Sequence, residues 1–410
     1  MKDHIISTFR NRIRLIHKQV NNTKIVHCGF IIDIGSRDEE EKNQGITHFW
    51  EHMAFKGTKS RKFYHIINRL ESVGGELNAF TTKEKICFYA SVQEKYFSHA
   101  VDLLTDIVFF SIFPEKEIIK ERQVILDEML MYQDIPEDSI QDDFEMVLFP
   151  EHAIGRNILG TKECIKSFKR TTFIRFIKDN LNSSRIIISV VGNITSSDCY
   201  HIVERSISDL PAYSGFNYRK FPVPAVSKNI TLKKNVSRAY CALGNSAYSI
   251  KDKNRLLFFM LINILGGPAM NSRLNMELRE RKGLVYSVEA VYTPFSDIGV
   301  FGIFFGTEFI QLKKSISLVK KEIKKLKMNP LGVLQLHKAK EQMIGQLAIS
   351  EENNVNLMIM LGRSLLDLDR IDLLDEIFRD IRNIKSSDLI RVAEEIFNEN
   401  ELSCLLYSPD

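Results

Sequence analysis

Apolar residues along this chain recur with two periods, and the periods alternate in the same order in both halves. In the first half the strand-like run KIVHCGFIIDIGS precedes a helix, the turn-and-strand pattern GGELNAFTTKEKICFYASV and the helical FSHAVDLLTDIVFF. In the second half SRAYCALGNSAYS precedes the helical KNRLLFFMLINILGG, the strand patterns GLVYSVEAVYT and GVFGIFFGT, and the helical IQLKKSISLVKKEIKKL. We therefore expect an α+β protein of two similar domains, each with hairpin strands covered by helices.

The expected boundary between the domains is the segment LPAYSGFNYRKFPVPAV, residues 210–226. It gathers three prolines and a glycine between patterned regions, as connections between domains do. A chain of 410 residues is also too long for one ordinary core. The sequence thus predicts a first domain over residues 1–209, a linker over 210–226 and a second domain over 227–410.

Charge and composition narrow the class of protein. The content of 44% hydrophobic and 26% charged residues is that of a globular protein without disordered or collagenous bias. The net charge of +4 is mild, and the lysine-rich run LKKSISLVKKEIKKLK is typical of the solvated face of an amphipathic helix. We expect no nucleic-acid partner.

Cysteine usage and the absence of long apolar runs indicate a compartment. The six cysteines are far apart and form no CxxC pair, which argues against a disulfide scaffold and suits a reducing environment. No run is long enough for a signal peptide or a membrane span. We expect a cytoplasmic protein without a membrane partner.

The motif HFWEH carries the first candidate chemistry. His48 and His52 are four residues apart, so on a helix both side chains can reach one point, and Glu51 flanks it. The rest of this helix is apolar nearly all round, which predicts burial, and buried imidazoles need partners. They are either ligands of a metal or core histidines bonded to Glu51 or to the backbone. The corresponding helix of the second half, FFMLINILGG, has no ligand-type residue, so any such chemistry belongs to the first half alone.

A catalytic zinc needs three protein ligands and one open position. The segment PEKEIIKERQVILDEMLMYQD has a helical pattern with an apolar stripe that includes Ile118, Ile125 and Met129. Glu121 and Glu128 lie on the same stripe, two turns apart. They are either solvated charges at the edge of the stripe or groups that face a cation.

These motifs resemble those of the pitrilysin-type (M16) metallopeptidases, the inverted zincins, which carry HxxEH. In that family the third ligand is a glutamate about 76 residues after the second histidine, within an ERxxxxxE helix. Here ERQVILDE places Glu128 76 residues after His52. HFWEHMAFKGT, GGELNAFTT, MYQDIPEDSIQDDFE and GRNILGT are most similar to the half-length subgroup that includes bacterial processing proteases and the mitochondrial processing peptidase.

The resemblance implies a fold, a metal and roles for these residues. The fold is the LuxS/MPP-like metallohydrolase fold, two similar domains, each a mostly antiparallel sheet covered by helices, that form half of a clamshell. His48, His52 and Glu128 would hold one Zn²⁺ per chain. Glu51 would be the general base, and Glu121 would orient a ligating histidine.

The resemblance also implies how a substrate is held. Asn78, Ala79 and Phe80 would lie on an edge strand that aligns an extended peptide by main-chain pairing; read by itself, this segment is an ordinary sheet strand. Arg279 and Tyr286 match an Arg and a Tyr that bind substrate backbone and help to stabilise the oxyanion. Because a half-length chain is half a clamshell, these two residues would complete the site of a partner subunit, and we expect a homodimer.

Three hypotheses of function follow. The leading one is a zinc endopeptidase that hydrolyses peptides or unfolded segments inside a closed chamber. The second is a non-catalytic core or substrate-binding subunit of a processing-peptidase-like heterodimer, which would have lost ligands or base. The third is a purely structural metal or histidine cluster, which leaves Glu51 without a task.

Overall fold

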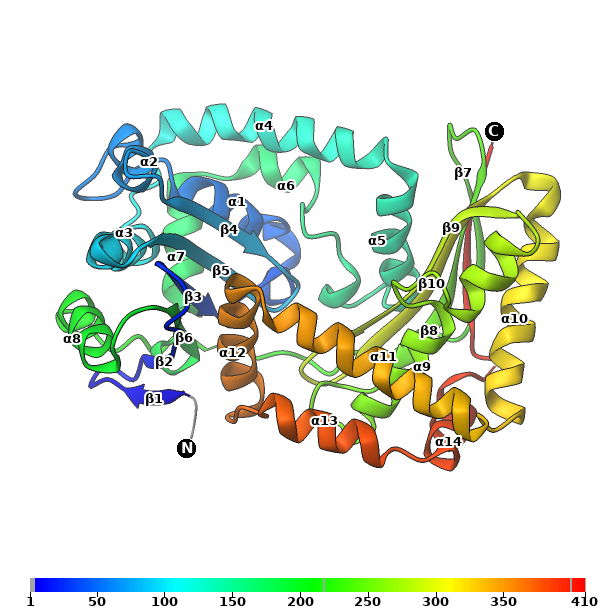
Figure 1. Cartoon of the computed structure of the whole chain (residues 1–410). Helices are drawn as coiled ribbons and strands as arrows, with labels where there is room; N and C mark the ends of the chain where they lie inside the picture. Colours follow the sequence, from blue (N-terminus) through cyan, green and yellow to red (C-terminus); the bar gives the residue numbers. More distant parts are fainter. Residues whose placement is uncertain (1–3, 217, 399, 410) are drawn as a thin grey trace. The chain divides into compact units, whose positions relative to one another are not determined.

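Two compact units make up the protein, each built around one β-sheet (Figure 1). The computed structural model describes residues 4–216, 218–398 and 400–409. The first unit takes the chain up to Met129, together with Asn157–Arg219 and Ile349–Ile371. The second unit takes Leu130–Arg156, Lys220–Ala348 and the chain from Asp372 onward.

The sheet of the first unit has the strand order β1-β2-β6-β3-β5-β4. Every neighbouring pair is antiparallel except β2 and β6, which are parallel. The strands are β1 (Ile5–Thr8), β2 (Arg14–Gln19), β3 (Ile25–Ile32), β4 (Glu76–Thr81), β5 (Ile86–Gln93) and β6 (Ile186–Gly192).

The sheet of the second unit repeats this arrangement without a counterpart of β1. Its order is β7-β11-β8-β10-β9, and the single parallel pair, β7 with β11, stands where β2 and β6 stand in the first sheet. The strands are β7 (Asn229–Lys233), β8 (Ala239–Ala247), β9 (Val285–Pro294), β10 (Gly299–Thr307) and β11 (Ser403–Ser408). The α+β fold of two similar, mostly antiparallel sheets covered by helices is confirmed.

Helices follow the strands in the same order in both halves. The first half has α1 (Ile46–Ala54), α2 (Phe63–Glu71), α3 (Phe97–Phe109), α4 (Glu115–Gln133), α5 (Pro136–Leu148), α6 (Lys162–Ser167), α7 (Arg170–Asn180) and α8 (Ser196–Ile207). The second half has α9 (Arg255–Gly266), α10 (Leu312–Met328), α11 (Val333–Glu351), α12 (Asn354–Leu368), α13 (Leu374–Asn383) and α14 (Ser386–Ile396). Among the described residues, no helix combines the length and the apolar character that a membrane crossing needs.

Each half contributes one helix to the other half's sheet. Helix α5 packs against β8, β10 and β11 of the second unit, while α12 packs against β2, β3 and β6 of the first. Both helices follow a 19-residue helix, α4 and α11, at matching places in the two halves. The exchange is therefore part of the duplicated pattern.

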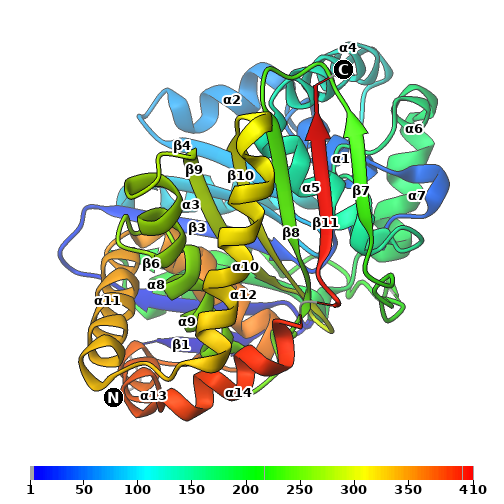
Figure 2. The ribbon, with the colours of Figure 1, turned by 90° about the vertical axis from the view of Figure 1, so that its right-hand side faces the viewer.

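Successive side chains of a strand point to opposite faces of the sheet, and this explains why each sheet needs the additional helix. In β10, Phe301 and Ile303 belong to the core under α9 and α10, whereas Val300 and Phe304 belong to the core under α5. Successive strand residues point to opposite faces, so a strand that is apolar on both faces must be covered on both. Figure 1 shows α5 on one side of the second sheet and α9 and α10 on the other, and Figure 2 shows α10 lying across this sheet.

Small residues allow α12 to lie close to the first sheet. A Cβ atom built on Gly362 would lie 2.2 Å from Ile31 Cδ1, and one built on Gly29 would lie 2.5 Å from Met358 Sδ. The Ser189 hydroxyl donates a hydrogen bond to the Met358 carbonyl oxygen at 2.6 Å. At the other end of the helix, a buried ion pair of 2.7 Å joins Asp367 to Lys85 in the β4–β5 turn.

Because the two halves exchange helices, the compact units do not coincide with the contiguous domains 1–209 and 227–410 expected from the sequence. Residues 130–156 and 349–371 each pack with the other half, because an apolar helical stripe predicts burial but not which sheet provides it. The described residues of the expected linker 210–226 form no helix or strand. The chain passes from one unit to the other within it, after Arg219, whose guanidinium group pairs with Asp33 and Asp38 at 2.9 and 2.7 Å.

Two glycine substitutions test the packing of α12. Gly362→Leu should lower the free energy of unfolding by about 1–3 kcal/mol, because the added side chain has no room against Ile31. Gly345→Ala in α11 is the matched control, since a Cβ there meets no atom within 4 Å, and it should raise stability by up to about 1 kcal/mol. Urea unfolding followed by circular dichroism measures both; equal effects would contradict the close approach of α12.

Candidate metal centre

Helix α1 places its functional side chains through a well-defined start. Gly45 precedes the helix with a φ of +88°, a left-handed conformation that favours glycine. The buried carboxylate of Glu39 accepts hydrogen bonds from the backbone N–H groups of Gly45 and Thr47, at 2.7 and 2.9 Å. These bonds satisfy free amide groups at the helix N-terminus. Burial raises the pKa of Glu39 to about 8, so the hydrogen bonds rather than a full negative charge stabilise this end of the helix. The register of α1 is thereby fixed before its first histidine.

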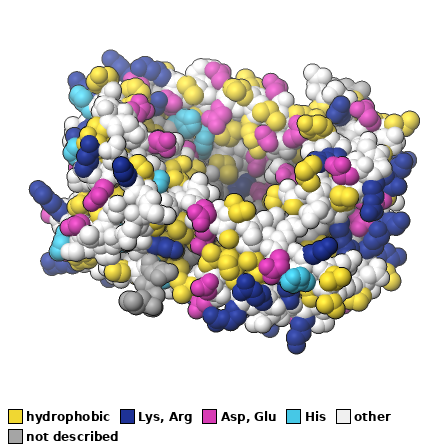
Figure 3. Space-filling view, in the orientation of Figure 1, with side chains coloured by type: hydrophobic (Ala, Val, Ile, Leu, Met, Phe, Trp, Pro, Cys, Tyr) yellow, Lys and Arg dark blue, Asp and Glu magenta, His cyan; other side chains and the backbone are white. Residues whose placement is uncertain are grey.

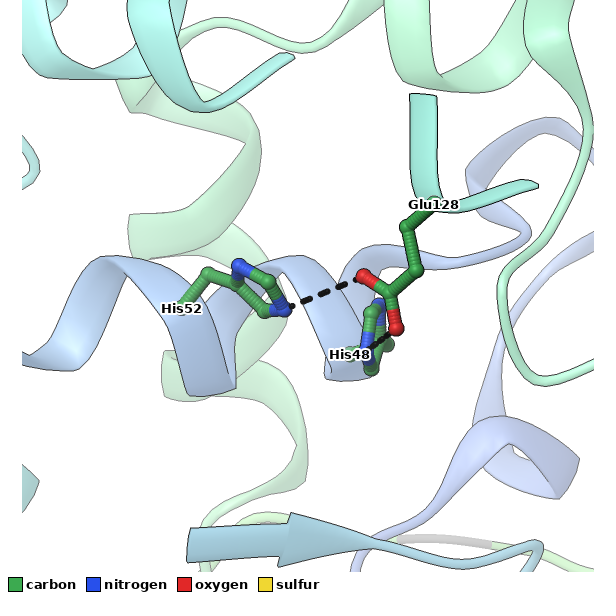
Figure 4. A group of neighbouring side chains, drawn as sticks. All are labelled: His48, His52 and Glu128. Carbon is green, nitrogen blue, oxygen red and sulfur yellow. Dashed lines mark ion pairs between the residues drawn. The ribbon is translucent and has the colours of Figure 1, made fainter. Parts of the chain in front are cut away.

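Two histidines of α1 and one glutamate of α4 converge on one point (Figure 4). Nε2 of His48 lies 3.7 Å from Oε1 of Glu128, and Nε2 of His52 lies 3.5 Å from Oε2 of Glu128. One ligand atom from each residue lies within 4.8 Å of the others. His48 is buried, and the two other side chains are partly exposed. The structure thus brings together the three predicted ligands, although Glu128 lies 76 residues after His52 along the chain.

The three donors fit a tetrahedral zinc ion. Atoms bound about 2.1 Å from a tetrahedral zinc lie about 3.4 Å from one another, close to the observed separations of 3.5 and 3.7 Å. Two imidazole nitrogens and one carboxylate are a common ligand set of catalytic zinc, and a set of three leaves one position for water. These residues could therefore hold the metal.

The imidazole of His48 is suited to bind as a neutral ligand. Burial, together with the neighbouring His52 ring, lowers the pKa of His48 to about 3. A neutral imidazole keeps a lone pair for a metal. In the part of the chain that the structure describes, its buried Nδ1 has no hydrogen-bond partner. This atom is distinct from Nε2, which faces Glu128, so its lack of a partner does not distinguish a metal ligand from a core histidine.

Glu121, the residue expected to orient a ligating histidine, contacts the ring of His52. Its Oε1 atom lies 3.3 Å from Nδ1 of His52, and Lys56 Nζ lies 2.6 Å from its Oε2. Burial raises the pKa of Glu121, but the hydrogen bonds from His52 and Lys56 outweigh it, and the pKa lies below its usual range. A carboxylate on Nδ1 fixes the ring so that Nε2 faces Glu128.

Glu51 lies on the same helix but outside the group of three donors. Its Oε2 atom accepts a hydrogen bond of 2.5 Å from the hydroxyl group of Thr81. Burial raises the pKa of Glu51, and the Thr81 hydrogen bond offsets part of this rise. A carboxyl group with a raised pKa beside a metal-type donor set has the properties of a general base or acid.

The expected substrate strand is at the edge of the first sheet. Strand β4 pairs with β5 alone among the described strands, with Asn78, Ala79 and Phe80 opposite residues 89, 88 and 87. Asn78 is exposed, and Ala79 and Phe80 are half-buried. The strand ends at Thr81, which contacts Glu51. An edge strand thus leads directly to the candidate base.

Arg279 and Tyr286 belong to the second unit. Arg279 lies in the π-helix Asn275–Glu280, where its guanidinium group pairs with Glu280 at 2.8 Å. It lines a cavity of about 330 Å³ within this unit, together with Tyr240 and Glu289. Tyr286 lies on β9, the edge strand that corresponds to β4, and is 86% exposed.

Thr81 and Lys56 were not predicted from the sequence. Lys56 follows His52 by four residues, a spacing that could have indicated a shared face. No local signal places Thr81 beside Glu51, because this contact joins a strand to a helix 30 residues away.

The fold and the donors define a class: a duplicated α+β protein whose described residues contain one set of zinc-type ligands, in the first half. Two family models match the chain, one described as "Insulinase (Peptidase family M16)" over residues 14–162 and one as "Peptidase M16 inactive domain" over residues 167–343. The chain belongs to the M16 peptidase family, as its motifs indicate.

Relatives of similar length support this assignment. The chain is 32% identical to "Uncharacterized zinc protease YmxG" of Bacillus subtilis, with 97% of both chains covered. It is 29% identical to "Probable mitochondrial-processing peptidase subunit beta" of Schizosaccharomyces pombe, with 91% of this chain and 84% of that protein covered. The crystal structure of a protease from Helicobacter pylori has the same fold, with a TM-score of 0.90, 21% identity and 99% of both chains covered.

Removing one donor tests the metal centre. Glu128→Gln should lower zinc affinity by at least about a hundredfold, because a neutral amide replaces an anionic ligand. Asp127→Asn is the matched control, since this neighbouring carboxylate is exposed and bonded only to Gln123. Competition with a chromogenic zinc chelator measures both affinities. Equal affinities in the two variants would exclude Glu128 as a ligand.

Proposed function

We propose that the protein is a zinc-dependent endopeptidase that acts on peptides or unfolded segments. The observation that carries this proposal is that Glu51, on the same helix as two of the three donors, bonds to the end of the free edge strand β4. A structural metal site would need neither a base nor a free strand beside it. The relatives named as zinc proteases support the same reading.

Each residue of the first unit has a task in this proposal. Zinc held by His48, His52 and Glu128 would lower the pKa of a water molecule and polarise the scissile carbonyl. The Glu51 carboxylate would accept the proton of the attacking water and then deliver it to the nitrogen of the leaving amine. Thr81 would hold this carboxylate in position, and Glu121 would hold the ring of His52.

The free edge of β4 would bind the substrate as an additional strand. Its main-chain N–H and C=O groups at Asn78, Ala79 and Phe80 can pair with any extended peptide, so recognition would depend on backbone more than on side chains. A folded domain cannot present such a strand. The proposed substrates are therefore peptides and unfolded segments.

The second unit would complete the site of a partner subunit. In a homodimer that encloses a chamber, Arg279 and Tyr286 would bind substrate backbone and stabilise the oxyanion. Their partly and largely exposed side chains are compatible with contact to another chain. We further propose that the protein acts in the cytoplasm, in keeping with six free cysteines.

The second candidate function is that of a non-catalytic core or substrate-binding subunit in a heterodimer. The relative named as a probable subunit of a processing peptidase raises it. A complete set of ligands together with Glu51 favours the catalytic role.

Glu51→Gln tests the base. The variant should bind zinc as the wild type does, since Glu51 is not among the donors, but its kcat should fall by about 10³-fold. Cleavage of a mixed peptide library, followed by mass spectrometry, measures activity beside the zinc content. Glu71→Gln, an exposed glutamate on α2, is the control and should retain full activity. Undiminished hydrolysis by Glu51→Gln would overturn the mechanism.

Two substitutions of Thr81 give a finer test. Valine keeps the size of the side chain but lacks the hydroxyl group, whereas serine keeps the hydroxyl group in a smaller side chain. Thr81→Val should lower kcat about tenfold with little change in KM, since Glu51 loses the bond that orients it. Thr81→Ser keeps the hydroxyl and should recover most of kcat. Equal kcat in both variants would show that the hydrogen bond has no part in catalysis.

A further inference from the structure

Helix α10 of the second unit has one apolar and one cationic face. Its buried side is formed by Leu312, Ser315, Val319, Glu322, Ile323 and Leu326. Its exposed side carries five exposed lysines, here named the lysine face: Lys313, Lys314, Lys320, Lys321 and Lys324. With 3.6 residues per turn, these five lie within one side of the helix.

No acidic group neutralises the lysine face. The only acidic residue of α10, Glu322, is buried and pairs with Lys325 at 2.5 Å. In the described part of the chain, none of the five lysines forms an ion pair with a carboxylate within 4 Å. Helix α14 packs beside α10 and carries exposed Glu394 and Glu395; the Glu395 carboxylate accepts a hydrogen bond from Tyr248, and neither forms an ion pair with the five lysines. Figure 3 shows Lys and Arg side chains gathered on the side where Figure 1 draws α10.

The charge pattern differs from that of an ordinary solvated helix. Solvated faces commonly alternate acidic and basic residues, which attract at spacings of three and four. Here Lys320 and Lys324, and Lys321 and Lys325, repeat the same charge at a spacing of four. Like charges at this spacing destabilise a helix slightly. An anionic partner would remove this repulsion.

Large apolar side chains stand at both ends of the lysine face. Phe309 and Ile310, in the short turn of helix Phe309–Gln311 before α10, are 62% and 87% exposed. Met328, the last residue of α10, is 66% exposed. These three side chains are not part of the core of the second unit. Their exposure to water is unfavourable, because apolar surface is stabilised by removal from water.

We propose that the lysine face, with Phe309 and Ile310, is a surface that binds an anionic lipid bilayer. Lysines attract the negative headgroups, and aromatic and aliphatic side chains enter the boundary between headgroups and acyl chains. The apolar residues favour lipid over nucleic acid, because a phosphate backbone offers them no apolar phase. Binding of this kind is peripheral, and it revises the expectation of no membrane partner.

Vesicle flotation of the full chain tests the proposal. The wild type should float with vesicles that contain phosphatidylglycerol, stay unbound with pure phosphatidylcholine, and dissociate as ionic strength rises. The triple variant Lys313→Gln, Lys321→Gln, Lys324→Gln should lose binding by at least about tenfold. Ile310→Ser should dissociate from the same vesicles at a lower ionic strength than the wild type, because the apolar contribution is lost while the charges remain.

Matched controls separate the surface from net charge and from exposed apolar area. Lys251→Gln, Lys253→Gln, Lys338→Gln removes the same charge from exposed positions outside α10, and Val226→Ser removes an aliphatic side chain that is also 87% exposed. Both should bind as the wild type does, and all variants should keep the wild-type peptide cleavage rate. No flotation of the wild type, or equal loss in the control triple, would overturn the proposal. Unchanged binding by Ile310→Ser with equal competition by duplex DNA would also overturn it, in favour of a general polyanion site.

Discussion

The packing of α4 against α1 decides whether this protein has a metal centre at all. Glu128 stands 3.5 and 3.7 Å from the Nε2 atoms of His52 and His48 because the apolar stripe of α4 is buried, with Ile118, Ile125 and Met129 in the core of the first unit. One turn of slippage along α4, about 5.4 Å, would remove the carboxylate from both imidazoles. Burial of apolar side chains, which has no directional preference, thus positions the carboxylate of Glu128 for metal binding, which does.

The second unit has the same sheet arrangement, but its described residues contain no set of metal-type donors. Its sheet repeats the order and the single parallel pair of the first, and α9 occupies the place of α1 in the chain. Yet α9 is almost wholly apolar and serves the core through residues such as Phe258, Met260 and Leu261. Metal ligands in a buried helix cost stability unless they are satisfied. Among the described residues, the duplicated fold has a set of metal-type donors in the first unit and none in the second.

The sequence predicts the fold class and the candidate metal ligands, but not every contact that positions them. The spacing of His48 and His52 defines a shared face without any tertiary information, and the stripe of α4 predicts that Glu121 is buried. The partner sheets of α5 and α12 were not predictable, because amphipathic periodicity indicates a buried face and not its neighbour. The Thr81–Glu51 bond was missed for the same reason: it depends on how a strand end meets a helix.

Anomalous diffraction at the zinc absorption edge, from crystals of the zinc-loaded protein, tests the central claim most directly. Zinc held by these residues should give one strong peak per chain, about 2.0–2.2 Å from Nε2 of His48, Nε2 of His52 and a carboxylate oxygen of Glu128, with Glu51 outside bonding distance. A peak bound through other residues, or one coordinated by Glu51 in place of Glu128, would contradict it.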